Sequence, residues 1–254
     1  QALLYNPKAI RIYSRGEYPQ AEMQRMFNDS RLRFLIGDIR DKDRLSRAMN
    51  GVDLVIHAAA LKRVEICEYN PIEANKTNIV GSENVVEAAI DNKVKKVLAI
   101  SSDKAVHPIN VYGVTKQAME KLIIGGNIYG DTRFSCIRSG NFEVSKGNVI
   151  DLWRQQLETN TEITVTDIEM SRYWITLEGI ARFAIQCLGM MTGGEIFIPK
   201  MVKTDLKETL RIFNPNVKIK YIGKRPGEKL TELLFNEGEI PEEHDDYFVG
   251  RAWG

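Results

Sequence analysis

Short apolar runs that end in small residues alternate with amphipathic segments in the first half of this sequence. The runs at 55–60 and 97–102 are nearly continuous in apolar residues, which is typical of strands covered on both faces of a parallel sheet. Such alternation predicts βαβ units and a doubly wound α/β sheet, in which ligands bind beyond the carboxyl ends of the strands. We predict strands at 9–14, 32–37, 54–58, 96–101 and 133–138. We predict helices at 18–27, 41–49, 72–91 and 111–124.

The pattern loosens after residue 140. Short strands are predicted at 163–165 and 195–199, and helices at 177–190 and 204–213. We therefore predict a doubly wound domain at 1–140 and a smaller α/β lobe at 141–254 that binds the substrate. Some segments of the lobe are expected to return to the first domain.

The composition excludes several classes of protein. The 254 residues carry 35 Lys+Arg and 34 Asp+Glu, and this net charge of +1 argues against nucleic acid as a partner. No apolar run approaches the ~20 residues that a membrane span needs, so we predict no membrane segment. The three cysteines and three histidines are scattered, which predicts neither a disulfide framework nor a metal site. Together these features predict a reduced, cytoplasmic protein.

Doubly wound sheets of this kind, called Rossmann-like, bind dinucleotides, and two early strands end in candidate ligands for the adenosine. Ser14 and Arg15 end the first predicted strand, where an arginine accepts the 2′-phosphate of NADP; the sequence thus favours NADP and leaves NAD possible. Asp38 and Ile39 follow the second strand, where a carboxylate accepts from the adenine amino group and a backbone N–H donates to the ring. Two alternatives stay open: Arg15 is an ordinary surface residue, and Asp38 caps the next helix.

Backbone that approaches a cofactor closely needs small side chains, and Ala58, Ala59 and Ala60 supply them at the end of the third strand. The glycine-rich Gly-x-x-Gly-x-x-Gly turn that follows the first strand of a dinucleotide fold occurs nowhere in the sequence. Residues 2–5 also read as the end of a helix. We therefore expect that the first βα unit of the domain is absent from this sequence.

A Tyr-x-x-x-Lys pair predicts the catalytic centre. Tyr112 and Lys116 share one face of a predicted helix because they lie four residues apart. The Lys116 ammonium is expected to lower the pKa of the Tyr112 phenol, which then takes a hydroxyl proton while hydride leaves for the nicotinamide. Ser102 ends the preceding strand and is expected to hydrogen-bond the same substrate oxygen.

Further motifs occur in order along the chain, and together they resemble the extended short-chain dehydrogenase/reductase family. Within it, the sequence resembles the UDP-N-acetylglucosamine 4,6-dehydratases of the polysaccharide-biosynthesis group, from residue 9 to about residue 249. The motifs are Gly37-Asp38, Ala58-Ala59-Ala60-Leu61-Lys62, Thr77-Asn78, Ser102-Asp103-Lys104, Pro108-Ile109-Asn110, Tyr112-x-x-x-Lys116, Gly140-Asn141 and Arg225-Pro226-Gly227-Glu228-Lys229.

The resemblance implies a lyase that oxidises C4 of the sugar, eliminates water across C5 and C6, and returns hydride to C6. It implies that Tyr112 is the base at the C4 hydroxyl, Asp103 the acid at C6 and Lys104 the base at C5, with inversion at C5. Asp103 must then be protonated and Lys104 neutral, which requires perturbed pKa values. The alternative for Asp103 and Lys104 is an ion pair in a surface loop.

The resemblance also implies binding residues. Thr77 is expected to line the nicotinamide pocket, next to Asn78, which supports the active-site loop. The two candidates for the substrate diphosphate are arginines, because a guanidinium grips phosphate in a bidentate manner. The residues expected to contact the UDP-sugar, most simply UDP-N-acetylglucosamine, are Lys62, Asn141, Arg172, Arg225 and Glu228. Family members typically self-associate, so a homo-oligomer is expected.

Two other functions remain open. A nucleotide-sugar 4-epimerase of the same fold needs Tyr112 and Lys116 but no acid–base pair for C5 and C6, so Asp103 and Lys104 argue against it. A non-catalytic dinucleotide sensor is favoured by the missing glycine-rich turn. The presence of Ser102, Tyr112 and Lys116 argues against the sensor.

Overall fold

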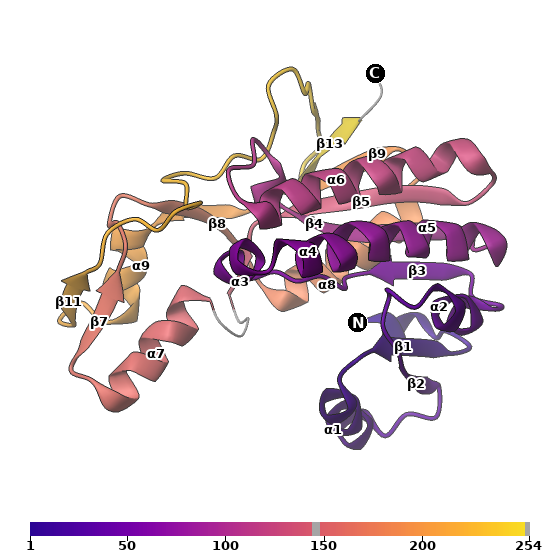
Figure 1. Cartoon of the computed structure of the whole chain (residues 1–254), viewed down its shortest axis with the longest axis horizontal. Coiled ribbons are helices and arrows are strands. Elements are labelled where there is room, and N and C mark those ends of the chain that lie inside the picture. The colour runs from indigo at the N-terminus through magenta and orange to yellow at the C-terminus, as the bar shows by residue number, and fades with distance from the viewer. Residues whose placement is uncertain (144–147, 252–254) are drawn as a thin grey trace.

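The computed structural model describes residues 1–143 and 148–251, and at its centre lies a six-stranded sheet (Figure 1). The strands β3, β4, β5 and β9 pair in parallel, and β13 and β12 add an antiparallel edge. The doubly wound parallel sheet expected from the sequence is thereby confirmed. The order across the sheet is β12 (Glu242–Glu243), β13 (Tyr247–Arg251), β9 (Glu195–Pro199), β5 (Arg133–Ser139), β4 (Lys96–Ser102) and β3 (Leu54–His57).

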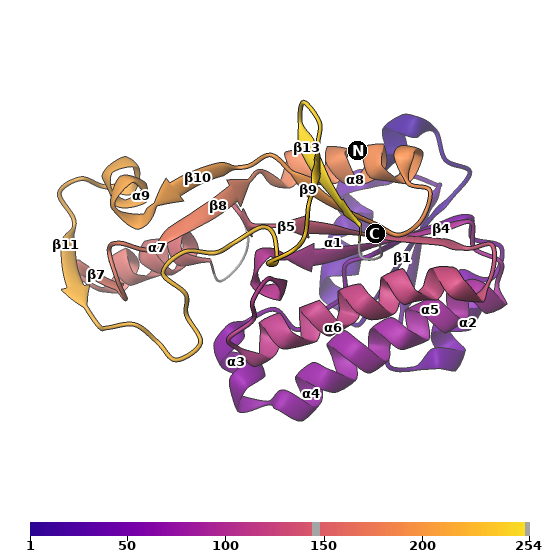
Figure 2. The same cartoon turned by 90° about the horizontal axis from the view of Figure 1, so that it is seen from above.

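Helices cover both faces of this sheet, which explains the unbroken apolar runs of its strands (Figure 2). On one face, Val97 and Ala99 of β4 pack with residues of α5 (Gly81–Asp91) and α6 (Val111–Gly125). On the other face, Leu98 of β4 packs against α8 (Leu177–Met190). Successive residues of a strand point to opposite faces, so a strand buried on both sides has no polar position to alternate with.

A separate pair of parallel strands lies beside β3. It consists of β1 (Ile10–Ser14) and β2 (Leu32–Ile36), with α1 (Glu17–Phe27) between them and a short 3-10 turn at Ala2–Tyr5 before them. After β2 comes α2 (Lys42–Met49), whose N-cap Asp41 accepts a hydrogen bond from the Arg44 backbone N–H. The capping role considered for Asp38 therefore belongs to Asp41.

The helix predicted at 72–91 consists of three pieces. They are α4 (Pro71–Asn75), a π-helical turn at Lys76–Val80 and α5, and α3 (Val64–Tyr69) precedes them as a helix that the sequence did not predict. A π-turn inserts one extra residue per turn and often lies at a functional site. Here it contains Thr77 and Asn78.

The smaller lobe is built around Trp153, which is fully buried. Its core includes Ile163, Val165 and Leu210, and the Trp153 indole N–H donates to the carbonyl of Thr164 (3.0 Å). Its elements are β6 (Asn141–Phe142), α7 (Val149–Thr159), β7 (Glu162–Val165), β8 (Ser171–Ile175), β10 (Val202–Asp205), α9 (Leu206–Phe213) and β11 (Lys218–Tyr221). Parallel pairing joins β11 to β7, and antiparallel pairing joins β10 to β8.

A buried arginine ties the segment after the lobe to the main domain. The Arg138 side chain, at the end of β5, is 1% exposed and bonds both Glu120 oxygens (3.1 and 2.8 Å) and both Glu239 oxygens (2.7 and 3.1 Å). It also donates to the carbonyl of Leu234 (2.8 Å). Glu120 lies on α6, so Arg138 connects the helix of Tyr112 to the segment 234–239.

Replacing Arg138 with Met is expected to destabilise the protein by about 3–5 kcal/mol, because it leaves the Glu120 carboxylate buried without its partner. Urea unfolding followed by circular dichroism measures the change. The matched control is Arg182→Met, which removes a pair to Glu178 whose side chains are 67% and 65% exposed and is expected to cost less than about 1 kcal/mol. An equal loss of the free energy of unfolding in the two variants would contradict the conclusion that Arg138 ties these segments together.

Candidate active site

A cavity of about 800 Å³ lies between the carboxyl ends of β4 and β5 and the smaller lobe. Ser102, Tyr112 and Lys116 line it from the main domain, and Thr164, Met170 and Leu206 line it from the lobe. Its position is the one expected for the ligand site of a doubly wound sheet.

The strand β4 leads directly into the Ser102-Asp103-Lys104 motif, which forms a 3-10 turn at Asp103–Ala105. Ser102 caps this turn by accepting a hydrogen bond from the Lys104 backbone N–H (3.3 Å), and it donates to Asp103 Oδ1 (3.0 Å). Gly113 packs against the turn: a Cβ there would lie 2.3 Å from the Lys104 carbonyl oxygen. Glycine is therefore required for α6 to approach the motif.

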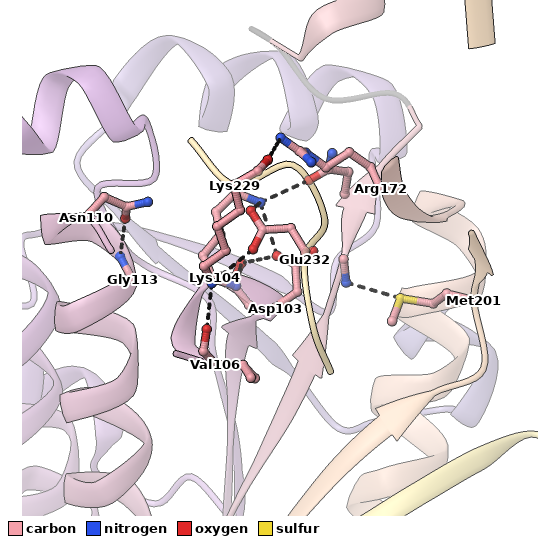
Figure 3. Close-up of polar contacts among 12 residues, drawn as sticks. Asp103, Lys104, Val106, Asn110, Gly113, Arg172, Met201, Lys229 and Glu232 are labelled. Carbon is pink, nitrogen blue, oxygen red and sulfur yellow. Dashed lines mark hydrogen bonds and ion pairs between the residues drawn. The ribbon is translucent and has the colours of Figure 1, made fainter. Parts of the chain in front are cut away.

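The Lys104 ammonium lies within a ring of polar groups (Figure 3). Its Nζ atom is 3.1 Å from Asp103 Oδ1, 3.4 Å from Asn141 Oδ1 and 3.6 Å from Glu232 Oε1. Burial opposes the charge on Lys104, but the two carboxylates outweigh burial and raise the pKa of the ammonium. Asp103 is fully buried, and its Oδ2 atom has no hydrogen-bond partner among the described residues. The pair is not the exposed surface pair considered from the sequence.

Tyr112 stands at the start of α6, next to Ser102. The N-cap of this helix is Asn110, which accepts from the Gly113 N–H (2.7 Å) and donates to the Gly227 carbonyl (2.8 Å). Burial raises the pKa of Tyr112, while the charge of Lys104 and a hydrogen bond with Ser102 act in the opposite direction. The cation identified as lowering the pKa of the phenol is Lys104, whereas the sequence suggests Lys116 for this effect.

Lys116 instead points its ammonium at the backbone of β4. Its Nζ atom donates to the carbonyl of Ile100 (2.5 Å) and lies 3.2 Å from the sulfur of Met119. Burial lowers the pKa of Lys116 to about 8. The side chain still lines the cavity, so it remains within reach of a ligand on this side.

The π-turn supports the loop that follows β3. Asn78 accepts a hydrogen bond from the Leu61 N–H (2.8 Å), donates to the Leu61 carbonyl (2.9 Å) and donates to Thr115 Oγ1 on α6 (2.9 Å). This geometry agrees with the supporting role expected for Asn78. Thr77 is 4% exposed, and its hydroxyl has no hydrogen-bond partner in the part of the chain that the structure describes.

His57, beneath this loop, gives the protein a pH dependence. Its Nε2 atom lies 2.9 Å from Ser82 Oγ, and burial lowers the pKa of His57 to about 3 from the ordinary 6.5. The unfolded chain then binds the extra proton as the pH falls below 6.5, so stability declines towards about pH 3.

We expect this histidine alone to cost about 1 kcal/mol between pH 7 and about pH 5.5. Urea unfolding at both pH values gives the loss of the free energy of unfolding for the natural protein and for His57→Gln. The difference between these two losses is the contribution of His57. Identical losses in the two proteins would show that His57 does not titrate in this way.

The residues expected at the adenosine lie outside the cavity, around the ends of β1 and β2. Ser14 Oγ accepts from the Gln20 amide (2.8 Å), and the Ile39 side chain is buried in the core. Arg15 has a side chain that is 57% exposed and reaches to 3.8 Å from Asp38 Oδ2. The Asp38 carboxylate also accepts from the Arg40 guanidinium (2.9 and 2.7 Å). The Asp38 carboxylate, which was expected to accept from the adenine amino group, is therefore paired with arginine side chains in this structure.

The residues expected at the substrate fall into two groups. Lys62, Asn141, Arg225 and Glu228 line the cavity. Arg172 also lines it, but its guanidinium donates to the carbonyl oxygens of Ser171 (2.8 Å), Lys229 (2.9 Å) and Leu230 (3.0 Å). In this structure Arg172 thus holds backbone. Of the small residues, Ala58 and Ala60 line the cavity.

Sequence reasoning missed one group entirely. Glu232 has a side chain that is 3% exposed, lines the cavity and faces both Lys104 and Lys229. Its only sequence signal is its place three residues after the Lys229 that ends the Arg-Pro-Gly-Glu-Lys motif.

Comparison with known proteins identifies the family of this chain. A family model described as polysaccharide biosynthesis protein matches residues 1–252. The chain belongs to this family. The resemblance drawn from the motifs is thereby confirmed.

Curated relatives of this chain include proteins named as dehydratases and proteins named as epimerases. The chain is 45% identical to a Campylobacter jejuni UDP-N-acetylglucosamine 4,6-dehydratase (inverting), over 96% of this chain and 75% of the relative. It is 40% identical to a UDP-glucose 4-epimerase of Rickettsia bellii, over 94% of this chain and 72% of the relative.

Solved structures agree on the fold. Pen from Bacillus thuringiensis superposes with a TM-score of 0.94 at 41% identity, over 100% of this chain and 83% of Pen. DesIV, a dTDP-glucose 4,6-dehydratase from Streptomyces venezuelae solved with NAD bound, gives 0.83 at 20% identity, over 90% of this chain and 79% of DesIV. The second likeness shows the fold alone.

Two searches of the described residues gave negative results. No helix among them combines the length and the apolarity of a membrane-spanning segment. No group of His, Cys, Asp and Glu side chains in residues 1–143 and 148–251 is arranged to hold a metal ion.

Proposed function

We propose that this protein is an inverting UDP-N-acetylglucosamine 4,6-dehydratase. The observation that carries the proposal is the Ser102-Asp103-Lys104 turn: Ser102 and Lys104 line the cavity together with Tyr112, and Asp103 is buried next to them, bonded to Lys104. It brings a hydroxyl, a phenol, a carboxyl group and an amine together, and dehydration needs an acid and a base in addition to the residues that serve C4. The C. jejuni relatives support the proposal.

A pyridine dinucleotide fits the residues present. Ala58 and Ala60 leave room along the cavity wall, and the Thr77 hydroxyl is a buried polar group with no hydrogen-bond partner among the described residues. The chemistry that a bound dinucleotide would supply here is hydride transfer from C4 and back to C6. Lys116 is assigned to hold the nicotinamide ribose, and Arg15 and Asp38 are assigned to the adenosine.

Tyr112 is assigned as the base for the C4 hydroxyl. Ser102 hydrogen-bonds the phenol and is placed to hold the same substrate oxygen. The Lys104 charge favours the phenolate form of Tyr112, which offsets part of the cost of burial. Together these groups position and deprotonate the hydroxyl while C4 is oxidised.

Asp103 and Lys104 are assigned to the elimination of water. Their hydrogen bond of 3.1 Å lets the ammonium proton pass to Asp103, which leaves the net charge of the pair unchanged. The transfer produces the neutral amine and the protonated carboxyl that the reaction needs. Lys104 then takes the C5 proton, and Asp103 gives its proton to the departing C6 hydroxyl.

The substrate nucleotide is assigned to the lobe side of the cavity. Arg225 is the candidate for the diphosphate, since Arg172 is engaged with backbone, and Glu228 is the candidate for the ribose. Asn141, which lies beside Lys104, is assigned to the sugar, and Lys62 to the substrate face of the loop after β3.

Three finer assignments follow. We propose NADP as the preferred dinucleotide because the exposed Arg15 guanidinium lies at the end of β1. Native mass spectrometry identifies the bound form.

We propose a cytoplasmic location, supported by the three free cysteines, which suit a reducing compartment. Cell fractionation tests this location. We propose a homo-oligomer, for which light scattering gives the molecular mass.

A 4-epimerase is the second candidate, because relatives with that name are 40% identical to this chain. It uses Tyr112 and Lys116 but assigns no chemistry to Asp103 and Lys104. Burial of the Asp103 carboxylate, whose Oδ2 atom lacks a hydrogen-bond partner among the described residues, costs stability. An epimerase would have no catalytic use for this buried group.

Product analysis separates the two candidates. The full-length protein is incubated with UDP-N-acetylglucosamine and no added dinucleotide, and the product is examined by mass spectrometry and NMR. Loss of one water and a new C6 methyl signal are expected. A product of unchanged mass with inverted C4 would establish the epimerase instead.

A further inference from the structure

Glu232 is a buried carboxylate next to the catalytic lysine. Its Oε1 atom lies 3.6 Å from Lys104 Nζ, and its Oε2 atom lies 3.2 Å from Lys229 Nζ. Lys229 is itself held by the Val106 carbonyl (2.6 Å). Figure 3 shows Glu232 beside Asp103 and the two lysines, at the wall of the cavity. A buried carboxylate is costly, so this arrangement calls for a reason beyond packing.

The backbone on both sides of Glu232 is fixed. Before it, Arg172 donates to the carbonyls of Lys229 and Leu230, and the Ser171 N–H also donates to Leu230 (2.8 Å). After it, Arg138 donates to the carbonyl of Leu234. Two arginines thus anchor the short segment that carries Glu232 against the site.

The charges around Lys104 make Glu232 distinctive. The charged and titratable groups that act on its ammonium are Asp103, Glu232, Arg172 and Tyr112. In the reactive state Asp103 is a neutral carboxyl group, since it must supply a proton. Until Asp103 gives its proton to the departing oxygen, Glu232 is the only carboxylate among these four groups, so it is the anion present when Lys104 begins to take the C5 proton. A cation formed in a buried site needs a nearby anion.

We propose that Glu232 is a positioning residue for water elimination, which holds the Lys104 amine at the cavity and stabilises the positive charge that Lys104 acquires. The proposal rests on the dehydratase function above. The C5–H bond breaks and its proton goes to Lys104 Nζ, while the electron pair forms the C5=C6 bond. The C6–O bond breaks, and the oxygen takes the Asp103 proton and leaves as water. Glu232 neither gains nor loses a proton.

The test compares Glu232→Gln with Glu232→Asp and with Glu237→Gln, an exposed control in the same segment. For Glu232→Gln we expect kcat to fall about tenfold or more and the acidic limb of the kcat profile to move about one pH unit lower. A C5-deuterated substrate is expected to show a larger isotope effect, because C5 deprotonation becomes slower. C4 oxidation, measured as transient reduced dinucleotide, is expected to be unchanged.

The outcomes separate the inference from the function on which it rests. A role of the negative charge is supported if the acidic limb of the kcat profile returns to its natural pH in Glu232→Asp and if Glu237→Gln keeps the natural kcat and pH profile. The inference is overturned if Glu232→Gln has the kcat, isotope effect and acidic limb of the natural protein. It is also overturned if the rates of C4 oxidation and of elimination fall equally in this variant. Absence of dehydrated product from the natural protein overturns the proposed function instead.

Discussion

Replacing Lys104 with Met is expected to slow formation of the dehydrated product by roughly 100- to 10,000-fold, the usual contribution of a general base. Methionine has a similar length and no basic nitrogen, so C5 keeps its proton. Tyr112 and Ser102 remain, and C4 oxidation is expected to continue. The variant should therefore accumulate reduced dinucleotide, seen by its near-ultraviolet absorbance, while product is followed by NMR.

The control for this variant is Lys207→Met, an exposed lysine on α9, which is expected to keep natural rates. Dehydrated product at the natural rate from Lys104→Met would remove Lys104 as the base. Loss of C4 oxidation together with product would mean that Lys104 serves the first step, through its charge on Tyr112.

Replacing Tyr112 with Phe is expected to lower kcat/KM by a similar factor, roughly 100- to 10,000-fold, but with a different signature. The C4 hydroxyl then lacks its base, so neither reduced dinucleotide nor product should form. The change removes one oxygen atom from a ring that keeps its packing against Cys67 and Ala74. The thermal midpoint is therefore expected to move little.

Tyr129→Phe is the matched control, because Tyr129 is 68% exposed. Reduced dinucleotide at the natural level in Tyr112→Phe would show that another group deprotonates the C4 hydroxyl. The two catalytic variants together separate the oxidation from the elimination.

The central sheet could be predicted from the sequence because its signal is local. Burial on both faces leaves β4 an unbroken apolar run, and α8 and β9 have the predicted bounds at Leu177–Met190 and Glu195–Pro199. Other elements depend on partners that are distant in sequence. The strand β11 pairs with β7, and β13 pairs with β9, across long intervening segments. Their short sequences do not reveal which distant strand each of them pairs with, because alternation along one strand carries no information about its partner.

In the candidate site, too, local features could be predicted from the sequence and contacts between distant segments could not. Motifs that follow strands or begin helices, such as Ser102-Asp103-Lys104 and Tyr112, were found because their spacing is local. Glu232 was missed because only the tertiary structure brings it to Lys104. The effect of Lys104 on Tyr112 was missed for a related reason, since only the tertiary structure brings Lys104 to the phenol, while Lys116 bonds the carbonyl of Ile100.

The most direct test of the proposed dehydratase uses UDP-N-acetylglucosamine with deuterium at C4, incubated with the full-length protein and no added dinucleotide. If one bound dinucleotide takes hydride from C4 and returns it to C6, the product contains deuterium in its C6 methyl group and lacks one water. NMR and mass spectrometry read both features from one sample. Deuterium that stays at C4 in a product of unchanged overall composition would contradict the dehydratase and establish epimerisation.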